Sequence, residues 1–355
     1  MVQYVEKYSQ VVSRILASLI ALSIFVIGNL EAQQNVPAPQ HELWVEYTGA
    51  DGPGKGKTIV LVSGDEEYRS EEALPMLGQI LAKKYGFTCI VLFAIDARTG
   101  EINALDQTNI PGLENLRRAD LMLISTRFRE LPDSQMKYID EYIQSGKPVI
   151  GLRTATHAFR YRRNKNSPFA KYDFKSEVKG WEDGFGRRVL GETWVDHHGV
   201  HGEEGTRALV DGIRQMEKHP ILNGVHDIWG GTDVYTVRAL PENCEVLLYG
   251  LSTSGMTPQS PVNFDKSVMP VAWTRTYTSD SGRRGRVFAT TMGASIDFLS
   301  EDLRRMIVNA CFWTLGMEDK IPEKADVAII GAYHPTMFST DLFKKGTFPS
   351  KYRLE

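Results

Sequence analysis

The sequence has few cysteines and no marked excess of charge of either sign. Three cysteines occur in 355 residues, each within an apolar segment, which favours buried free thiols over a disulfide framework or a zinc site. The formal net charge is -3, from 41 basic and 44 acidic residues. Nucleic-acid-binding proteins carry a strong basic excess, so the composition argues against that class of partner.

One apolar run, near the N-terminus, approaches the length of a membrane span. Residues 15–28 are ILASLIALSIFVIG, preceded by Lys7 and Arg14 and followed by residues suited to a signal peptidase. The run is shorter than the roughly 20 residues of a membrane-spanning helix, which favours a cleaved secretory signal over a retained anchor. We therefore expect a signal peptide at 1–32, a Pro- and Gly-rich arm at 33–57, and an exported protein, periplasmic or extracellular, that leaves the membrane after cleavage.

After this arm, short apolar runs alternate with amphipathic segments. Strands are predicted at 58–64, 88–95, 119–126 and 147–152, and helices at 70–86 and 132–146. Strands that are apolar throughout and alternate with helices predict an α/β fold with a parallel sheet covered on both faces. Ligands of such sheets bind beyond the carboxyl ends of the strands, where four polar loops follow here.

The second half of the chain is less regular. Residues 164–206 contain few periodic segments and predict an irregular insertion. Further elements are predicted as a strand pair at 231–240 and 244–252, an added β-hairpin at 269–293, and a helix at 300–316 capped by Ser300.

Residues 196–204, DHHGVHGEE, form the densest group of acid–base side chains. Imidazoles and carboxylates that lie close together bind a divalent metal or transfer protons. The spacing matches no metalloprotease helix, and Gly199 and Gly202 favour a loop. Three interpretations stay open: a polar substrate-binding loop, a metal site, or a purely structural segment.

Arg153 follows the last predicted strand of the first half, at the turn where many α/β enzymes carry a nucleophile. A guanidinium there holds an anion or carboxylate through its fork of donors. The carboxylate belongs either to a ligand or to the protein itself, at Asp65, Glu66 or Glu67.

Three other positions allow both a functional and a structural interpretation. A short helix after Arg153 would place Thr154 and His157 on one side, where His157 is a general base or a histidine satisfied by backbone. Asp233 shares one face of a predicted strand with Tyr235. Trp273 stacks on a sugar or belongs to the core.

The segments KPVIGLRTATHAF, HPILNGV, TDVYTV, PVAWTRTY, GRVFATTMGAS and LRRMIVNACFWTLG, in this order, resemble the ThuA-like family, named for trehalose utilisation. The resemblance spans about residues 58–316 and leaves 317–355 as a C-terminal extension. It implies the fold of class I glutamine amidotransferases, a flavodoxin-like three-layer parallel sheet, here with the irregular insertion and the added β-hairpin.

The amidotransferases end the corresponding strand in a Gly-x-Cys-x-Gly elbow. Arg153 stands at the cysteine position here and Ala155 at the second glycine, so the resemblance implies no glutaminase activity. Ala294 replaces the histidine that the family tends to carry after the GRVF strand. The family implies a role in carbohydrate metabolism, on a keto-sugar or a disaccharide.

Our first hypothesis is an exported sugar-processing enzyme with a cleft above the sheet. His157 or His198 acts as base, Asp233 or Glu66 orients it, and Arg153 polarises a carbonyl or carboxylate. The expected substrate-binding residues are Glu66, Tyr68, Arg127, Arg153, Thr154, His197 and Trp273, and no metal ligand is assigned. The alternatives are a non-catalytic module for a small ligand and a metal-dependent hydrolase. The sequence does not identify a cofactor, and it is compatible with a homo-oligomer.

Overall fold

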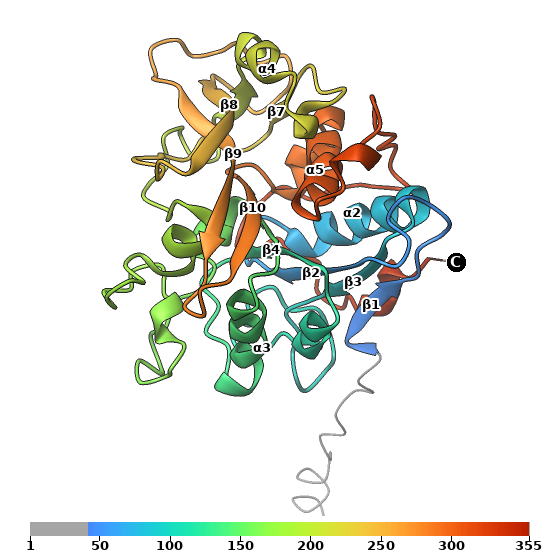
Figure 1. Cartoon of the computed structure of the whole chain (residues 1–355), viewed down its shortest axis with the longest axis vertical. Helices are drawn as coiled ribbons and strands as arrows, with labels where there is room; N and C mark the ends of the chain where they lie inside the picture. The colour runs from blue at the N-terminus through green and yellow to red at the C-terminus, as the bar shows by residue number, and fades with distance from the viewer. Residues whose placement is uncertain (1–41, 355) are drawn as a thin grey trace, which may run out of the picture. The chain divides into compact units, whose positions relative to one another are not determined.

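A computed structural model of the protein describes residues 42–354; the predicted signal peptide and residues 33–41 of the predicted arm lie outside the described residues. A ten-stranded sheet has the order β1-β3-β2-β4-β5-β10-β9-β8-β6-β7 (Figure 1). The strands are β1 Trp44–Tyr47, β2 Thr58–Gly64, β3 Thr88–Leu92, β4 Leu121–Thr126, β5 Val149–Leu152, β6 Gly205–Ala208, β7 Trp229–Gly230, β8 Cys244–Thr253, β9 Met269–Thr278 and β10 Arg284–Thr290.

The sheet is mixed rather than parallel throughout. The strands β3, β2, β4 and β5 run parallel to one another, as predicted for the first half of the chain, and β10 joins β5 in the same direction. Both flanks are antiparallel, with β1 on β3 at one end and β9, β8, β6 and β7 at the other. The predicted hairpin is confirmed as β9 and β10, and β10 also joins β5.

Four α-helices accompany the sheet within the described residues: α2 Ser70–Tyr85, α3 Asp133–Gln144, α4 Val210–Met216 and α5 Glu301–Thr314. Helices α2 and α5 cover one face and α3 the other (Figure 1). In β2, Ile59 and Leu61 pack toward α2 and α5, whereas Val60 and Val62 pack toward α3. Successive side chains point to opposite faces of a strand, so a strand covered on both sides must be apolar throughout.

The predicted strand at 231–240 is wrong. Apart from an isolated bridge between Tyr235 and His197, this segment has no strand pairing, and β8 pairs with β9 and β6 instead. The backbone carbonyl of Asp233 accepts a hydrogen bond from Arg153 Nη1 at 3.1 Å. The next backbone groups pair with residues 196–199: the carbonyl of Val234 accepts from the amides of His198 and Gly199, and the amide of Thr236 donates to the carbonyl of Asp196.

The C-terminal extension packs along the α2 side of the domain. Its residues Ile321, Ala325 and Val327 are buried in the same cluster as α2 and α5. Farther along, Tyr352 stacks on Phe93 with ring centroids 5.7 Å apart. The extension therefore contributes to the core of the described domain.

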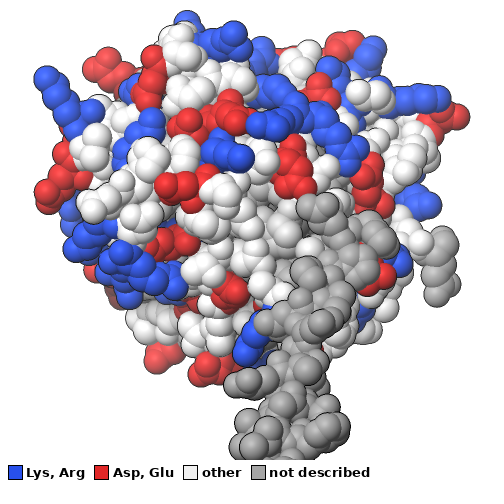
Figure 2. Space-filling model, turned by 90° about the horizontal axis from the view of Figure 1, so that it is seen from below, with Lys and Arg blue, Asp and Glu red and all other residues white. Residues whose placement is uncertain are grey.

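On the face seen in Figure 2, basic and acidic side chains are interspersed, in keeping with the nearly balanced charge. Between residues 42 and 354, every helix is too short or too polar to cross a bilayer.

Candidate functional site

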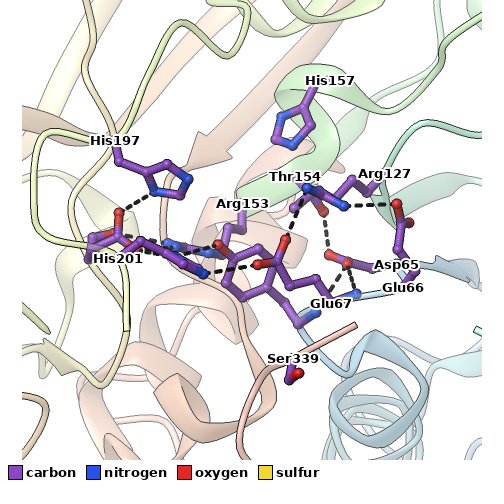
Figure 3. Close-up of polar contacts among 12 residues, drawn as sticks. Asp65, Glu66, Glu67, Arg127, Arg153, Thr154, His157, His197, His201 and Ser339 are labelled. Atoms are coloured by element: carbon purple, nitrogen blue, oxygen red, sulfur yellow. Dashed lines mark hydrogen bonds and ion pairs between the residues drawn. The ribbon is translucent and has the colours of Figure 1, made fainter. Parts of the chain in front are cut away.

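The site lies at the carboxyl ends of the parallel strands, as the loop positions predict (Figure 3). The loops after β2, β4 and β5 supply Asp65, Glu66, Glu67, Arg127, Arg153 and Thr154. The irregular second half supplies His197, His201 and Asp233. Segments more than a hundred residues apart thus meet at one edge of the sheet.

Arg153 has an unusual backbone conformation, and its side chain is turned into the protein. Its φ is 40°, a left-handed conformation that is rare for a residue with a side chain. The guanidinium is fully buried, and its Nη2 lies 3.0 Å from Oδ1 of Asp233. It also lies between the rings of Tyr68 and Tyr235, 4.1 and 4.3 Å from their centroids. The predicted contact of Arg153 with a substrate is therefore corrected: its partner is internal, and it is Asp233 rather than Asp65, Glu66 or Glu67.

The buried carboxylate of Asp233 contacts two histidines that are partly exposed at the surface. Its Oδ2 accepts a hydrogen bond from His197 Nδ1 at 2.6 Å, and its Oδ1 lies 3.3 Å from His201 Nδ1. Burial raises the pKa of Asp233, but the hydrogen bonds from both histidines and the charge of Arg153 outweigh it and lower the pKa. An ionised, fully buried carboxylate thus supports imidazole side chains that are 29% and 38% exposed.

A close approach of the backbone makes this arrangement possible at Gly199. A Cβ atom there would lie 2.9 Å from Cβ of Asp233, so a larger residue would push the histidine loop away from the carboxylate.

His201 bridges two carboxylates. Its Nε2 lies 3.0 Å from Oε1 of Glu67, while its Nδ1 faces Asp233. Hydrogen bonds to Asp233 and Glu67 raise the pKa of His201 to about 9, so its ring is an imidazolium at neutral pH. Burial raises the pKa of Glu67, but the hydrogen bond from His201 and the charge of Arg127 lower it overall.

Arg127 is the partly exposed cation of the site. Its side chain is 22% exposed, and it pairs with Glu66 at 2.8 Å and Glu67 at 3.1 Å. Glu66 is itself buried between Arg127 and Arg129 and fixes their position. Of these two predicted substrate-binding residues, Arg127 therefore lies at the surface of the site. Glu66 is buried and holds the Arg127 side chain in place.

Thr154 and Tyr68 are also inside the protein. The hydroxyl of Thr154 donates to Asp65 Oδ2 at 2.6 Å, and Asp65 Oδ1 accepts from the backbone amides of Glu67 and Tyr68. Both Thr154 and Tyr68 are almost completely buried. They fix the loops rather than face a ligand, contrary to the substrate-binding role predicted for them.

His157 lies beneath the site in an aromatic cage. It is 2% exposed, and ring centroids of Phe128 and Trp194 lie 5.0 and 5.3 Å from its own. Burial first, and then the charge of Arg127, hold the pKa of His157 well below its usual range. His157 is therefore a neutral, enclosed ring, which removes the surface contact that a general base needs.

Two other predicted residues lie away from the cluster. Nε2 of His198 faces the backbone oxygen of Ser267 at 2.8 Å, and His201 takes the place expected for it. Trp273 is fully buried in the sheet core and its indole donates to Leu190 O at 2.7 Å. The sugar-stacking role of Trp273 is thus corrected, because its ring has no exposed face.

Sequence reasoning missed three contributors to the site. The sequence predicts Glu67 only as a candidate partner of Arg153, and it gives no signal for Trp194. Trp194 is partly exposed, and its ring centroid lies 5.7 Å from that of His197. Phe338, from the C-terminal extension, stacks on Tyr68 with ring centroids 5.3 Å apart. An isolated aromatic residue far along the chain carries no signal that would place it here.

The cluster also has a donor set that could hold a metal. One ligand atom each from His197, His201 and Asp233 lies within 4.8 Å of the others. Imidazole and carboxylate ligands suit divalent transition metals. The same atoms are already joined by hydrogen bonds, and Arg153 adds a cation beside Asp233.

The fold of the chain is similar to that of two solved structures, at low sequence identity. A ThuA-like protein from Parabacteroides merdae ATCC 43184 is 13% identical, with a TM-score of 0.46, over 81% of this chain and 99% of its own. A cytoplasmic protein from Salmonella typhimurium LT2 is 14% identical, with a TM-score of 0.39, over 75% of this chain and 100% of its own. No curated protein matches the chain.

The family comparison is more extensive. The model of the ThuA family, described as trehalose utilisation, matches residues 59–314. This range includes every strand from β3 to β10, all four α-helices, and the histidines and Asp233 of the site. It covers well over half of the chain, and the chain therefore belongs to the ThuA family.

Proposed function

We propose that the chain is an exported enzyme that acts on a carbohydrate, a keto-sugar or an oxidised (keto) disaccharide, by proton transfer at His197. The observation that carries the proposal is the hydrogen bond from Nδ1 of His197 to the buried Asp233, at 2.6 Å, with the His197 side chain 29% exposed. A carboxylate behind an accessible imidazole orients the ring and stabilises its charged form, which is what a general base needs.

The hydrogen bond gives the proton transfer a direction. Because Nδ1 of His197 carries the proton donated to Asp233, Nε2 holds a lone pair that can accept a proton. A C–H bond next to a sugar carbonyl gives its proton to Nε2, and its electron pair moves toward the carbonyl oxygen to form an enediolate. The positive charge of His201 lies beside His197, with ring centroids 4.6 Å apart, and stabilises that oxygen. Arg127 shares the Glu67 carboxylate with His201 and adds a second positive charge to the site.

The surroundings of His197 suit a sugar. Trp194 and Phe128 are partly exposed, and Arg127 lies over the Phe128 ring, 4.5 Å from its centroid. Aromatic rings pack against the apolar faces of pyranoses, while charged groups bind the hydroxyls. Membership of a family described by trehalose utilisation supports the same class of substrate. With Arg153 at the elbow, no thiolate is present there for glutaminase chemistry.

The test measures two rates: exchange of the substrate C–H proton with D2O, and turnover. Both are measured with keto-disaccharides and, for comparison, with plain disaccharides. His197→Ala should lower the rate of C–H exchange in D2O about 100-fold or more, the usual contribution of a general base. His198→Ala, one residue away but turned toward Ser267, is the matched control and should leave the rate unchanged. Equal losses in both variants would contradict the proposal, and so would a rise in melting temperature with sugar but no turnover, which supports a non-catalytic binding module.

A metal-dependent hydrolase is the second candidate, favoured by the three ligand atoms of His197, His201 and Asp233 within 4.8 Å. Three protein ligands beside an open position are typical of catalytic metal sites. Metal analysis of the purified protein decides between the candidates. Stoichiometric metal that is lost in His197→Ala and retained in His198→Ala would replace proton transfer by metal chemistry, and metal-free protein with full turnover would exclude it.

A further inference from the structure

We propose that Phe338, in the C-terminal extension, is a positioning residue that holds the His201 imidazole between Glu67 and Asp233. The inference deepens the proposed function, on which the role of His201 rests. Phe338 lies outside residues 59–314, which match the ThuA family, so this part of the site belongs to the extension of this chain.

The segment that carries Phe338 is fixed on both sides. Before it, the amide and hydroxyl of Thr336 both donate to the carboxylate of Glu72, at 2.7 and 2.9 Å. After it, the amide of Ser339 donates to the carbonyl of Glu67 at 3.0 Å, and Arg69 donates to the carbonyl of Ser339 at 2.9 Å. These bonds tie residues 336–339 to the loop after β2 and to the start of α2.

Between these anchors, the Phe338 side chain points into the site. It is 6% exposed and packs with Tyr68 and Ala294 in a small apolar cluster. Its ring centroid lies 5.1 Å from that of His201. The small side chain of Ala294, which is fully buried, leaves room for the aromatic ring at this point.

The hydrogen bonds of His201 involve only its two ring nitrogens, so packing against the carbon atoms of the ring is needed to fix its orientation. Nε2 faces Glu67 and Nδ1 faces Asp233, with the Tyr68 hydroxyl 3.5 Å from Nδ1. The ring belongs to a loop whose next residue is Gly202, and its side chain is 38% exposed. Packing by Phe338 restricts rotation of the ring, so that both hydrogen bonds form together.

The test observes the imidazole N–H protons of His201 by NMR, in protein labelled with 15N-histidine and without any substrate. Such protons are visible when hydrogen bonds and packing protect them from exchange. The wild type should show His201 N–H signals, assigned by their loss in His201→Gln. Phe338→Leu should lose these signals and retain the N–H signal of His197, while Phe338→Tyr, which keeps the ring, should retain both.

Met337→Ala is the matched control, because Met337 is the neighbouring side chain and is 44% exposed. It should leave all imidazole signals unchanged. If Phe338→Leu does not fold, Phe338→Met carries the same expectation, since methionine adapts to irregular spaces. Persistence of the His201 signals in a folded variant without the ring would overturn the inference. Because no substrate is used, this outcome is independent of whether the sugar chemistry proposed for His197 is correct.

Discussion

Arg153 and Asp233 form an ion pair in which neither side chain is exposed, with Nη2 of the arginine 3.0 Å from Oδ1 of the aspartate. Asp233 in turn holds His197 and His201 at the surface. The arginine at the elbow therefore acts on the site through a carboxylate of the protein. The residue that follows β5 thus supports the side chains that face solvent.

Replacing Arg153 should destabilise the protein strongly. Arg153→Met leaves the Asp233 charge buried beside the two histidines without its guanidinium, which costs about 3–5 kcal/mol in comparable pairs. Arg153→Lys should restore little, because an ammonium lacks the fork that reaches Asp233 and Thr291 together. Urea denaturation measures the free energy of unfolding.

Arg117→Met is the control for the buried pair. Arg117 pairs with Glu141 on the surface, where side chains are 61% and 46% exposed, and such pairs contribute about 0–1 kcal/mol. If the Arg153 and Arg117 variants lost the same small amount of unfolding free energy, the buried Arg153–Asp233 pair would stabilise the protein no more than a surface pair does.

The stability contributed by His201 should depend on pH in a defined direction. Its pKa is raised to about 9 by hydrogen bonds to Asp233 and Glu67, whereas an unfolded histidine titrates near 6.5. A raised pKa stabilises the folded state fully below the unfolded pKa, and the contribution disappears as the pH rises through about 9.

The measurement compares the free energy of unfolding of the wild type and His201→Gln between about pH 6 and pH 10. The advantage of the wild type should be largest at the acid end and should vanish above the folded pKa. A difference that stays constant, or grows with pH, would contradict the assignment of an imidazolium bound by two carboxylates.

Trp194 should contribute to sugar binding through its exposed ring beside His197. Loss of an aromatic contact worth about 1.4 kcal/mol weakens binding about tenfold, so Trp194→Ala should raise the Kd of a bound disaccharide by about that factor. Calorimetry measures it. Trp229→Ala is the control, because Trp229 is similarly part-exposed but belongs to β7 at the far edge of the sheet; an equal effect there would argue against a specific contact.

The fold was more predictable than the site. The strands β2 to β5 are apolar throughout, which follows from burial on both faces, and their loops supply half of the cluster. The ionic partner of Arg153 could not be predicted, because Asp233 lies 80 residues away in a segment with the pattern of a strand. Its carboxylate and its backbone carbonyl both accept hydrogen bonds from Arg153, and the periodicity of the sequence does not indicate such long-range contacts.

The histidine loop shows a second limit. His197, His198 and His201 are equivalent by composition, and only the direction of each side chain separates them. The turn around Gly199 and Gly202 brings His197 and His201 to Asp233 and sends His198 to Ser267. His197 and His198 are neighbours in the sequence but point to different partners. The sequence pattern does not indicate which of them faces Asp233.

The proposed export of the protein can be tested separately. Cleavage after the apolar run at 15–28 should give a mature protein that begins near Gln33. Intact mass spectrometry of protein recovered from the periplasm or medium measures the N-terminus. Recovery of the chain only inside the cell, with residues 1–32 retained, would contradict the exported location.

The most direct test of the central claim is a crystal structure of the protein with a keto-disaccharide bound. We predict that the C–H group next to the sugar carbonyl lies within proton-transfer reach of His197 Nε2, with Arg127 or His201 at the carbonyl oxygen. Sugar bound elsewhere, as in the cavity of about 770 Å³ that Ile213 and Val225 help to line, with His197 free of ligand, would contradict the account.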